Sequence, residues 1–467
     1  MRNYFHFQRF DEESVLITND FGRYLFLSND EFRLFVCGQI ALSSELEQKL
    51  RERLFLLDEM QLYSLDVAKS LQDMKCYLFS PTTLHIFVVT NVCNFRCVYC
   101  QAQTQQQHSN GFMSFEIGKR AIDIALQSPA HQLTFEFQGG EPLMNFPVIR
   151  QMIEYTEAVC GDKQITFSLV SNLSLATKEI LDFLTAHQVM LSTSLDGPQD
   201  LQDVNRKMCT GASSYAHILE KLCLLQSVSG SAGAIQTTTR ASLSRAREIV
   251  QEYAALHMKG IFLRPLTPLG FAKDDWAEVG YTPEEFLEFY QKAFEEILQI
   301  NRNGTWFPEQ HAQYFLRKIL GGFAFNYMEL RSPCGAGIGQ MAYYYDGKVY
   351  TCDEARMVAE SGDELFCLGD VFTGDYQSLV SSETCKATCA ASVMESLPGC
   401  CDCVYQPYCG VCPVINYALE GDVFAKQAHG YRCQIYGGIL HYLFSLLKQA
   451  DAQTIDILYS WIEEETP

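Results

Sequence analysis

Apolar runs alternate with helix-length segments through the middle of the 467-residue chain. Amphipathic segments such as Ser114–Gln127 and Thr177–His187 begin with a residue that can cap a helix. The runs between such segments have the composition of buried strands: Leu84–Thr90, Leu133–Gln138, Ile165–Ser171, Val189–Leu195, Ala234–Thr239 and Gly260–Leu266. Six βα units predict an α/β fold, a partial (β/α)6 TIM-like barrel over residues 80–310. In such barrels the functional residues follow the C-terminal ends of the strands.

The N-terminal 75 residues have a different pattern. Three short strand-like runs, Phe5–Phe10, Ser14–Thr18 and Arg23–Leu27, are separated by turn-forming residues, and two helical segments follow. This order predicts a winged-helix-like module over residues 1–75. Many such modules bind DNA, but this one lacks the basic helix that DNA binding would need.

The C-terminal third divides into three parts. A helical segment over residues 311–331 bridges from the barrel to residues 332–435, which contain 11 of the 19 cysteines and show little periodicity. A region with so little regular patterning needs metal or cross-links to hold its shape. Residues 436–467 return to helical spacing and are predicted as one C-terminal helix.

Charge and hydropathy exclude several classes of function. The chain has 35 Lys and Arg against 56 Asp and Glu, a net charge of -21, and it lacks the basic run that nucleic-acid binding requires. No apolar stretch reaches the roughly 18 residues of a membrane span, and the N-terminus lacks an apolar signal segment. We therefore expect a cytoplasmic protein that contacts neither nucleic acid nor membrane.

The cysteines fit metal ligation better than a disulfide scaffold, because a reducing cytoplasm disfavours disulfides. Five of them lie in apolar or helical surroundings and are expected to be buried and inert: Cys37, Cys76, Cys160, Cys209 and Cys223.

The strongest motif follows the first barrel strand, where Cys93, Cys97 and Cys100 form a C-x3-C-x2-C run. Three thiolates on one loop can hold three irons of a 4Fe-4S cluster and leave the fourth iron open. A structural zinc site, the alternative, usually has four closed ligands. This loop, with Tyr99 before its last cysteine, resembles that of the radical S-adenosylmethionine (SAM) enzymes. In that family the open iron binds SAM, and electron transfer cleaves SAM to a 5′-deoxyadenosyl radical.

The resemblance extends to the ends of the following strands. Gly139-Gly140-Glu141-Pro142 ends the second strand, Asn172 the third and Ser194 the fourth. The cofactor-binding residues that the resemblance implies are Tyr99, Gly139, Gly140, Glu141, Pro142, Asn172, Ser194 and Arg206, while Asp196 would shape the substrate side. Strand-end turns and a surface salt bridge are the structural alternative for these positions.

The C-terminal cysteines resemble a SPASM domain, the auxiliary-cluster module of radical SAM enzymes that modify peptides. The pattern assigns one cluster to Cys334, Cys352 and Cys412 and a second to Cys400, Cys403, Cys409 and Cys433, which makes three 4Fe-4S clusters in all. The first auxiliary cluster then has three ligands. Either its fourth iron is open, or one of Cys367, Cys385, Cys389 and Cys401 completes it. Zinc held by the paired C-x2-C motifs is the alternative.

An acidic residue follows the second cysteine of this module. In sulfatase-maturating enzymes, which the chain resembles here, an aspartate at this position takes a proton from the substrate. Asp353 is therefore a candidate general base. A solvated loop carboxylate is the equally weighted alternative.

Over nearly its whole length the chain resembles radical SAM maturases of ribosomal peptides. The first 28 residues and the stretch Leu397–Pro413 are most similar to the His-Xaa-Ser system maturases of the HxsB type. The activity implied is hydrogen abstraction from a precursor-peptide side chain, followed by an intramolecular crosslink of the cyclophane type. Thioether formation and anaerobic sulfatase maturation are the enzymatic alternatives, and an iron-sulfur scaffold or electron carrier is the non-enzymatic one.

The same resemblance implies partners. A leader peptide would add as a strand to the N-terminal module, in a groove formed by Tyr24–Leu27 with Phe32 and Leu34. A module that only stabilises the barrel is the alternative. An electron donor of the flavodoxin or ferredoxin type would supply the clusters, and a second maturase is a further partner of such systems.

Overall fold

The computed structural model describes residues 1–41, 44–58, 64–102, 111–228, 230–321, 327–425 and 428–463, and its centre is one nine-stranded sheet. All six predicted strands are present: β4 (Leu84–Thr90), β6 (Gln132–Gly139), β7 (Gln164–Val170), β8 (Met190–Ser194), β10 (Ala232–Thr237) and β11 (Phe262–Arg264). They pair in parallel in the order β11-β10-β8-β7-β6-β4. The predicted run of parallel strands is therefore confirmed.

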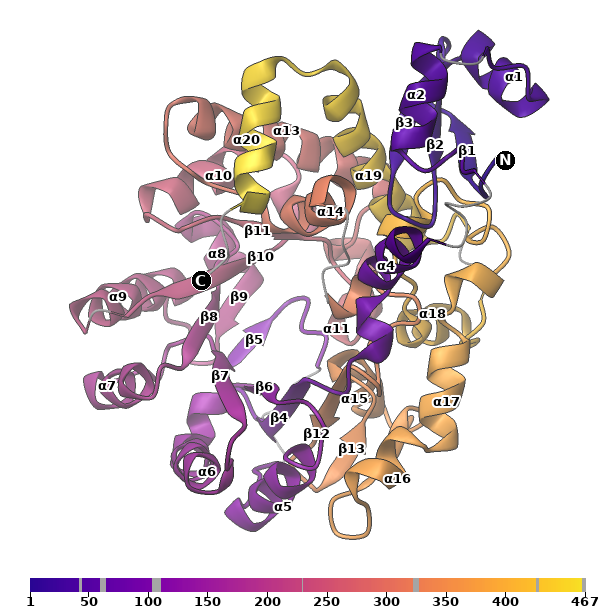
Figure 1. Cartoon of the computed structure of the whole chain (residues 1–467). Helices are drawn as coiled ribbons and strands as arrows, with labels where there is room; N and C mark the ends of the chain where they lie inside the picture. The colour runs from indigo at the N-terminus through magenta and orange to yellow at the C-terminus, as the bar shows by residue number, and fades with distance from the viewer. Residues whose placement is uncertain are drawn as a thin grey trace.

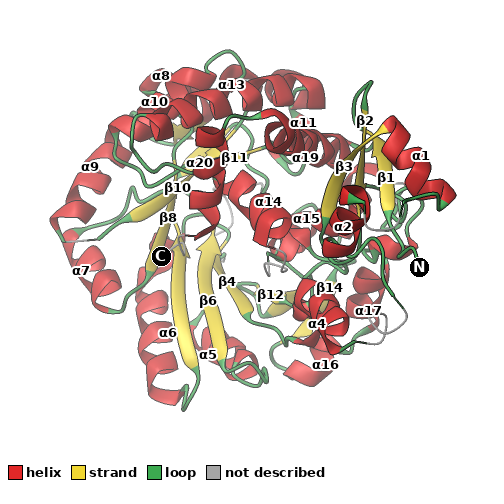
Figure 2. Ribbon diagram, turned by 45° about the horizontal axis from the view of Figure 1, so that its top comes forward, coloured by secondary structure: helices red, strands yellow, loops and turns green. Residues whose placement is uncertain are grey.

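Helices cover the outer side of this sheet. They are α5 (Phe115–Ala125), α6 (Phe146–Val159), α7 (Lys178–Ala186), α8 (Gln199–Asn205), α9 (Ser214–Ser227) and α10 (Ala246–Ala255). Figure 2 shows the strands in an arc with these helices outside it. Ile86, Phe87, Val88 and Val89 of β4 are all buried, as expected for a parallel strand covered on both faces.

The cysteine-rich region continues the same sheet. Strand β12 (Gln340–Tyr343) pairs in parallel with β4, and β13 (Lys348–Tyr350) and β14 (Cys367–Asp370) follow as antiparallel neighbours. Helices α15 (Asp353–Ala359), α16 (Tyr376–Val380), α17 (Glu383–Ala390) and α18 (Pro413–Glu420) complete it. The region thus has more regular structure than its sequence pattern predicted, because the edge of β4 supplies backbone partners for β12.

The N-terminal unit has the predicted three strands. Its sheet is the meander β1 (His6–Arg9), β2 (Ser14–Thr18) and β3 (Tyr24–Ser28), followed by α1 (Asn29–Cys37), α2 (Glu45–Glu52) and α4 (Leu65–Met74). Tyr24 and Phe26 pack with Phe444 of helix α19 (Tyr431–Gln449), with ring centroids 5.1 and 6.3 Å apart. Figure 1 shows this unit beside α19. The aromatic face of β3 that was expected to form the leader groove is therefore covered by α19.

The C-terminal segment contains two helices where one was predicted. Helix α19 ends at Gln449, and α20 (Ala452–Glu463) begins after a short extended break, while residues 464–467 lie outside the described part of the chain. Both helices pack against α13 (Pro283–Arg302) and α14 (Gln310–Gly321). Within the described ranges, no helix combines the length and apolar character needed to cross a membrane.

The prediction that five cysteines are buried is wrong for four of them. Cys37, Cys76, Cys209 and Cys223 are exposed, and Cys160 is half-buried. Apolar neighbours in the sequence do not decide burial, because they can lie on another face of the same helix. In α9, for example, Ile218 and Leu225 point into the protein, and Cys223 does not.

A buried carboxyl group joins strand β11 to helix α14. Glu309 accepts hydrogen bonds from the Leu263 amide (3.1 Å), the Ala312 amide (2.6 Å) and the Tyr290 hydroxyl (2.6 Å). Burial raises the pKa of Glu309 from 4.5 to about 7, against the opposing effect of these hydrogen bonds.

Glu309 should make the stability of the protein depend on pH. Because its pKa is higher in the folded state, its favourable contribution is complete below pH 4.5 and is lost as the pH rises to about 7. Relative to Glu309→Gln, the wild type should lose up to ~1.4 kcal/mol of unfolding free energy per pH unit across this window. Urea unfolding at several pH values measures the difference. The exposed carboxylate of Glu288, changed to glutamine, should give no such slope.

Candidate functional site

A cavity of about 750 Å³ opens at the C-terminal ends of the barrel strands. Its lining comes from the cysteine loop after β4, from strands β6 to β11 and from helix α15. It includes ten of the residues predicted for the site: Cys93, Cys97, Tyr99, Cys100, Gly139, Gly140, Asn172, Ser194, Arg206 and Asp353. Residues spread over 261 positions of sequence, from 93 to 353, thus face one space.

The cysteine loop is fixed by a short two-stranded sheet. Strand β5 (Phe95–Cys97) pairs antiparallel with β9 (Arg206–Met208), so that Cys97 lies opposite Arg206. The Nη1 atom of Arg206 is 4.0 Å from the Cys97 sulfur. Burial raises the pKa of the Cys97 thiol to about 12 and also raises that of Cys93. A thiol in such surroundings loses its proton when iron binds its sulfur atom in place of the proton.

The donor set fits a cluster better than a single ion. Among the described residues, no three His, Cys, Asp or Glu side chains are arranged to hold one metal ion. A 4Fe-4S cluster places each cysteine on a different iron, so its ligands do not converge on one point. Cys93, Cys97 and Cys100 all line the cavity wall, and the charges of Cys97 and Cys100 both help to raise the pKa of Cys93, as expected for thiols that are neighbours.

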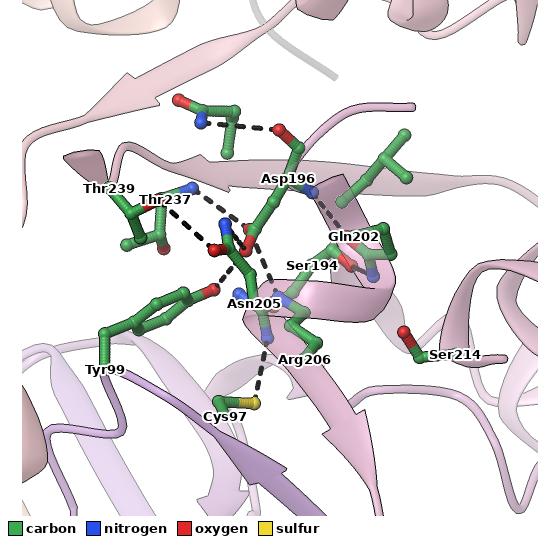
Figure 3. Close-up of polar contacts among 12 residues, drawn as sticks. Cys97, Tyr99, Ser194, Asp196, Gln202, Asn205, Arg206, Ser214, Thr237 and Thr239 are labelled. Carbon is green, nitrogen blue, oxygen red and sulfur yellow. Dashed lines mark hydrogen bonds and ion pairs between the residues drawn. The ribbon is translucent and has the colours of Figure 1, made fainter. Parts of the chain in front are cut away.

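A buried network around Asp196 holds two of the predicted cofactor-binding side chains (Figure 3). The Tyr99 hydroxyl (2.7 Å) and the Asn205 amide (3.1 Å) donate to one carboxylate oxygen. Arg206 Nε (3.1 Å) and the Thr237 backbone amide (3.3 Å) donate to the other. Asp196 is fully buried. It therefore fixes Tyr99 and Arg206 in position, and the surface salt bridge given above as the alternative for these positions is instead a buried pair.

The strand-end glycines are pressed against the start of the cysteine loop. A Cβ atom on Gly139 would lie 2.2 Å from the Thr90 carbonyl oxygen, and one on Gly140 would lie 2.3 Å from the Val92 carbonyl oxygen. The Gly140 amide donates to the Thr90 carbonyl at 2.8 Å. Only glycine fits between two backbones this close, and the backbone of β6 therefore forms part of the cavity wall.

Replacing Gly140 by alanine should displace the cysteine loop. The added methyl group overlaps backbone atoms, so we expect the unfolding free energy to fall by about 1–3 kcal/mol. We expect 5′-deoxyadenosine release to fall by about 10²-fold, because misplacement by about 1 Å has such effects. Gly233→Ala is the matched control, since Gly233 lines the same cavity and its added Cβ meets nothing within 4 Å. Equal losses of stability and of 5′-deoxyadenosine release in the two variants would show that the close approach of Gly140 to the Val92 carbonyl is not what requires glycine.

The remaining residues of the GGEP motif lie behind the cavity wall. Glu141 is fully buried and accepts hydrogen bonds from the Ser171 hydroxyl (2.7 Å) and the Asn172 amide (2.8 Å). Pro142 is buried at the start of a 3-10 turn over residues 142–145. Neither residue lines the cavity. In this structure Glu141 ties the end of β6 to the end of β7, and its carboxylate lies outside the lining of the cavity.

The C-terminal cysteines separate into the two groups that the motif implied. Cys334, Cys352 and Cys412 line a second, smaller cavity that adjoins the first. After burial, the charges of Cys433 and Cys403 raise the pKa values of both Cys400 and Cys409, and the adjacent Cys401 also raises that of Cys400. Three of the unassigned cysteines lie elsewhere, Cys367 on β14 and Cys385 and Cys389 on α17, whereas Cys401 directly follows Cys400 of the second group and lies beside Asp402.

Asp353 begins helix α15 and faces the large cavity. Its Oδ1 atom accepts a hydrogen bond from Arg356 Nε at 2.7 Å. Glu136 of β6 lies near it, and burial followed by the charge of Asp353 raises the pKa of Glu136. Sequence reasoning missed Glu136, although strand alternation could have found it: Thr134, Glu136 and Gln138 all line the cavity.

The arrangement of strands and cysteines matches a known family. Residues 87–239 match the sequence model of the radical SAM superfamily. Residues 87–239 are a radical SAM domain. It contains the three loop cysteines, the strand-end glycines and Arg206.

Relatives of the radical SAM domain extend into the cysteine-rich region. The chain is 24% identical to a serine-type anaerobic sulfatase-maturating enzyme of Bacteroides thetaiotaomicron, across 78% of this chain and 90% of that one. It is 29% identical to an uncharacterized protein of Methanocaldococcus jannaschii, across 39% of this chain and 62% of that protein.

Solved structures share the fold of the radical SAM domain and its surroundings. Native anSMEcpe with bound AdoMet superposes with a TM-score of 0.68 at 20% identity, covering 81% of this chain and 100% of that one. Streptococcus suis SuiB bound to precursor peptide SuiA has a TM-score of 0.55 at 15% identity, covering 91% and 98%. At these identities the two likenesses show that the chain shares its fold with both proteins.

Proposed function

We propose that the protein is a radical SAM peptide maturase with three 4Fe-4S clusters, one on the barrel loop and two in a C-terminal SPASM module. The observation that supports this most directly is the shared cavity, where Cys93, Cys97 and Cys100 face the strand ends and Asp353. When bound, the loop cluster supplies the electron that cleaves SAM to a 5′-deoxyadenosyl radical.

The residues of the cavity wall orient SAM in this proposal. The backbone at Gly139 and Gly140 offers an edge that no side chain blocks. Arg206, held by Asp196, presents a fixed positive charge beside Cys97. Asn172 and Ser194 add polar groups from the ends of two further strands. Together these groups would bind a zwitterionic amino acid and a ribose.

Asp353 is the proposed base for the substrate. Its carboxylate reaches the cavity, and the hydrogen bond from Arg356 fixes its orientation. Hydrogen abstraction acidifies neighbouring bonds of a substrate radical, so a positioned carboxylate can then accept a proton.

Asp353→Asn should separate the two halves of the reaction. Asparagine can still accept the hydrogen bond from Arg356, so we expect the fold and 5′-deoxyadenosine release to persist. The yield of modified peptide should fall by about 10²–10⁴-fold, the usual contribution of a general base. Liquid chromatography with mass spectrometry measures both products. The exposed Asp346, changed to asparagine, should leave both unchanged, and unchanged peptide yield in Asp353→Asn would exclude the proposed base.

The proposed substrate is a ribosomal precursor peptide, and the favoured product is a cyclophane-type carbon-carbon crosslink in a His-Xaa-Ser type system. SuiB, a structural relative, was solved with its precursor peptide. The N-terminal unit would receive the leader through an edge of its sheet, because α19 covers the aromatic face of β3. Electrons would come from a flavodoxin or ferredoxin, and a second maturase could share the pathway.

Sulfatase maturation is the second candidate. The 90% coverage of the Bacteroides relative favours it, and thioether formation is a third possibility. The test is coexpression with any short peptide found to be encoded beside the gene, followed by mass spectrometry. A crosslinked peptide is expected to lose the mass of two hydrogens without alkylatable thiols being consumed. Consumption of a cysteine thiol would indicate a thioether, and an unmodified peptide together with formylglycine in a coexpressed sulfatase would overturn the proposal.

A further inference from the structure

The large cavity extends further into the barrel than the residues proposed to bind SAM. Strand β6 points alternate side chains into it, so Thr134, Glu136 and Gln138 line the wall ahead of the glycines at the strand end. Glu136 lies three positions before Gly139, which places it about 10 Å deeper at about 3.3 Å per residue. The inner part of the cavity is therefore available to a second molecule when SAM occupies the strand ends.

Carboxylates outnumber positive groups along the inner part of the cavity wall. Away from the cysteine loop, the charged side chains among the described lining residues are Glu136, Arg264, Glu329, Asp353, Glu354 and Arg356. Asp353 pairs with Arg356, with Oδ1 2.7 Å from Nε. Arg264 Nη2 lies 3.7 Å from a carboxylate oxygen of Glu354 and 3.9 Å from one of Glu329. Both arginines are therefore engaged by the other three carboxylates.

Glu136 is the carboxylate that has no positive partner. Within the described part of the chain it forms no ion pair, and its hydrogen bonds come from two neutral groups, the Ser168 hydroxyl at 3.2 Å and the side-chain amide of Gln138. Its side chain is half-buried in the central strand of the barrel, directly opposite Ser168 of β7. An anion partly removed from water is stabilised better by a positive charge than by neutral donors. The cavity at Glu136 thus fits a positively charged group.

We propose that Glu136 is a specificity-determining residue that binds a positively charged side chain of the substrate peptide, namely the ammonium group of a lysine, the guanidinium group of an arginine or the imidazolium group of a histidine. Ser168 and Gln138 hold the carboxylate in a fixed orientation for this ion pair. The charged end of the side chain then lies in the inner cavity, and its carbon atoms extend toward the strand ends, where the radical would form. This inference rests on the proposed action on a peptide and names the class of residue that the cavity accepts.

Binding of short peptides tests the proposal. The probes are blocked pentapeptides with two glycines on each side of a central lysine, arginine, histidine, norleucine, glutamine or aspartate. Isothermal titration calorimetry with the full chain, anaerobically reconstituted and saturated with SAM in the absence of a reductant, measures their dissociation constants. The buffer has a pH of about 6, at which histidine is mostly protonated, and about 0.15 M salt to screen the net negative charge of the protein. We expect at least one positively charged peptide to bind about 10–100-fold more tightly than the norleucine and glutamine peptides.

Variants of Glu136 separate charge recognition from a structural role. Glu136→Gln keeps the size of the side chain and can still accept the hydrogen bond from Ser168, but it should reduce the preference for the positive peptide to less than about twofold. Glu136→Lys should reverse the preference and favour the aspartate peptide, which a loss of packing alone would not produce. Glu288→Gln is the matched control, because it removes the same charge from an exposed position on α13 and should keep the full preference.

Two results would overturn the proposal: a wild type that binds no positive peptide more tightly than the neutral ones, and a Glu136→Gln variant that keeps the wild-type preference. Because Glu136→Gln is nearly isosteric, this comparison holds even if Glu136→Lys does not fold. Release of 5′-deoxyadenosine by the reduced protein tests the radical function separately. A protein that cleaves SAM without a charge preference would reject the role of Glu136 alone, and one that has the preference but cleaves no SAM would reject the proposed function.

Discussion

Cys97→Ala is expected to reduce 5′-deoxyadenosine release by about 10³-fold or more, because loss of a group on which the chemistry depends has effects of this order. Two remaining thiols cannot hold three irons, and no other cysteine lines the large cavity beside Cys93 and Cys100. The iron content of the anaerobically reconstituted protein should fall by about four atoms. Chromatography of the reaction with SAM and a reductant measures the product, and colorimetric iron analysis measures the loss.

The matched control for this prediction is Cys223→Ala. Cys223 is exposed on α9 and lines neither cavity. It should keep full iron content and full 5′-deoxyadenosine release. Equal release by Cys97→Ala and Cys223→Ala would show that the loop is not the site of SAM cleavage.

The barrel and its cysteine loop could be predicted from sequence because their signals are local. Each parallel strand is a short apolar run, and its C-terminal end is visible as a turn. Pairings between distant segments give no such signal. The pairing of β12 with β4 joins residues about 256 positions apart. The pairing of Cys97 with Arg206 joins residues 109 positions apart. Neither segment differs in composition from an ordinary edge strand or loop.

The sequence also does not predict in which direction a side chain at the end of a strand points. The alternation of β6 predicts which residues face the cavity up to Gln138, but Gly139 has a φ of +155° and breaks the pattern. Glu141 therefore turns behind the wall, where Ser171 and the Asn172 amide receive it. A motif shows which residue types are present at such a turn, and the structure is needed to show which of them face the ligand.

The sequence also does not predict whether a charged pair is buried, because a buried Asp–Arg pair such as Asp196 and Arg206 has the same residue types as a pair on the surface. In the structure the Asp196 side chain is fully buried and that of Arg206 is 11% exposed. Burial and the carboxylate act in opposite directions on the pKa of Arg206, and the carboxylate of Asp196, with Tyr99 and Cys97, raises it. The charge of the Arg206 guanidinium is thus stabilised by the Asp196 carboxylate and nearby groups, and not by water.

Asp196→Ala is accordingly expected to lower the unfolding free energy by about 3–5 kcal/mol, the usual effect of leaving a buried charge without its partner. The variant leaves Arg206, Tyr99 and Asn205 without their shared acceptor. Urea unfolding under reducing, iron-free conditions measures the loss without a contribution from cluster binding.

The contrast that tests this account is another Asp–Arg pair a few residues away. Asp200 pairs with Arg245 at 2.6 Å, but the Asp200 side chain is 72% exposed. Water replaces the lost partner in Asp200→Ala, so its cost should stay below about 1 kcal/mol. If both variants lost the same amount of unfolding free energy, burial would not determine how much the Asp196–Arg206 pair contributes to stability. The same carboxylate fixes Tyr99 of the cysteine loop and Arg206 beside that loop. A large loss in Asp196→Ala alone would therefore show that one interaction determines both the stability of the barrel and the geometry of its site.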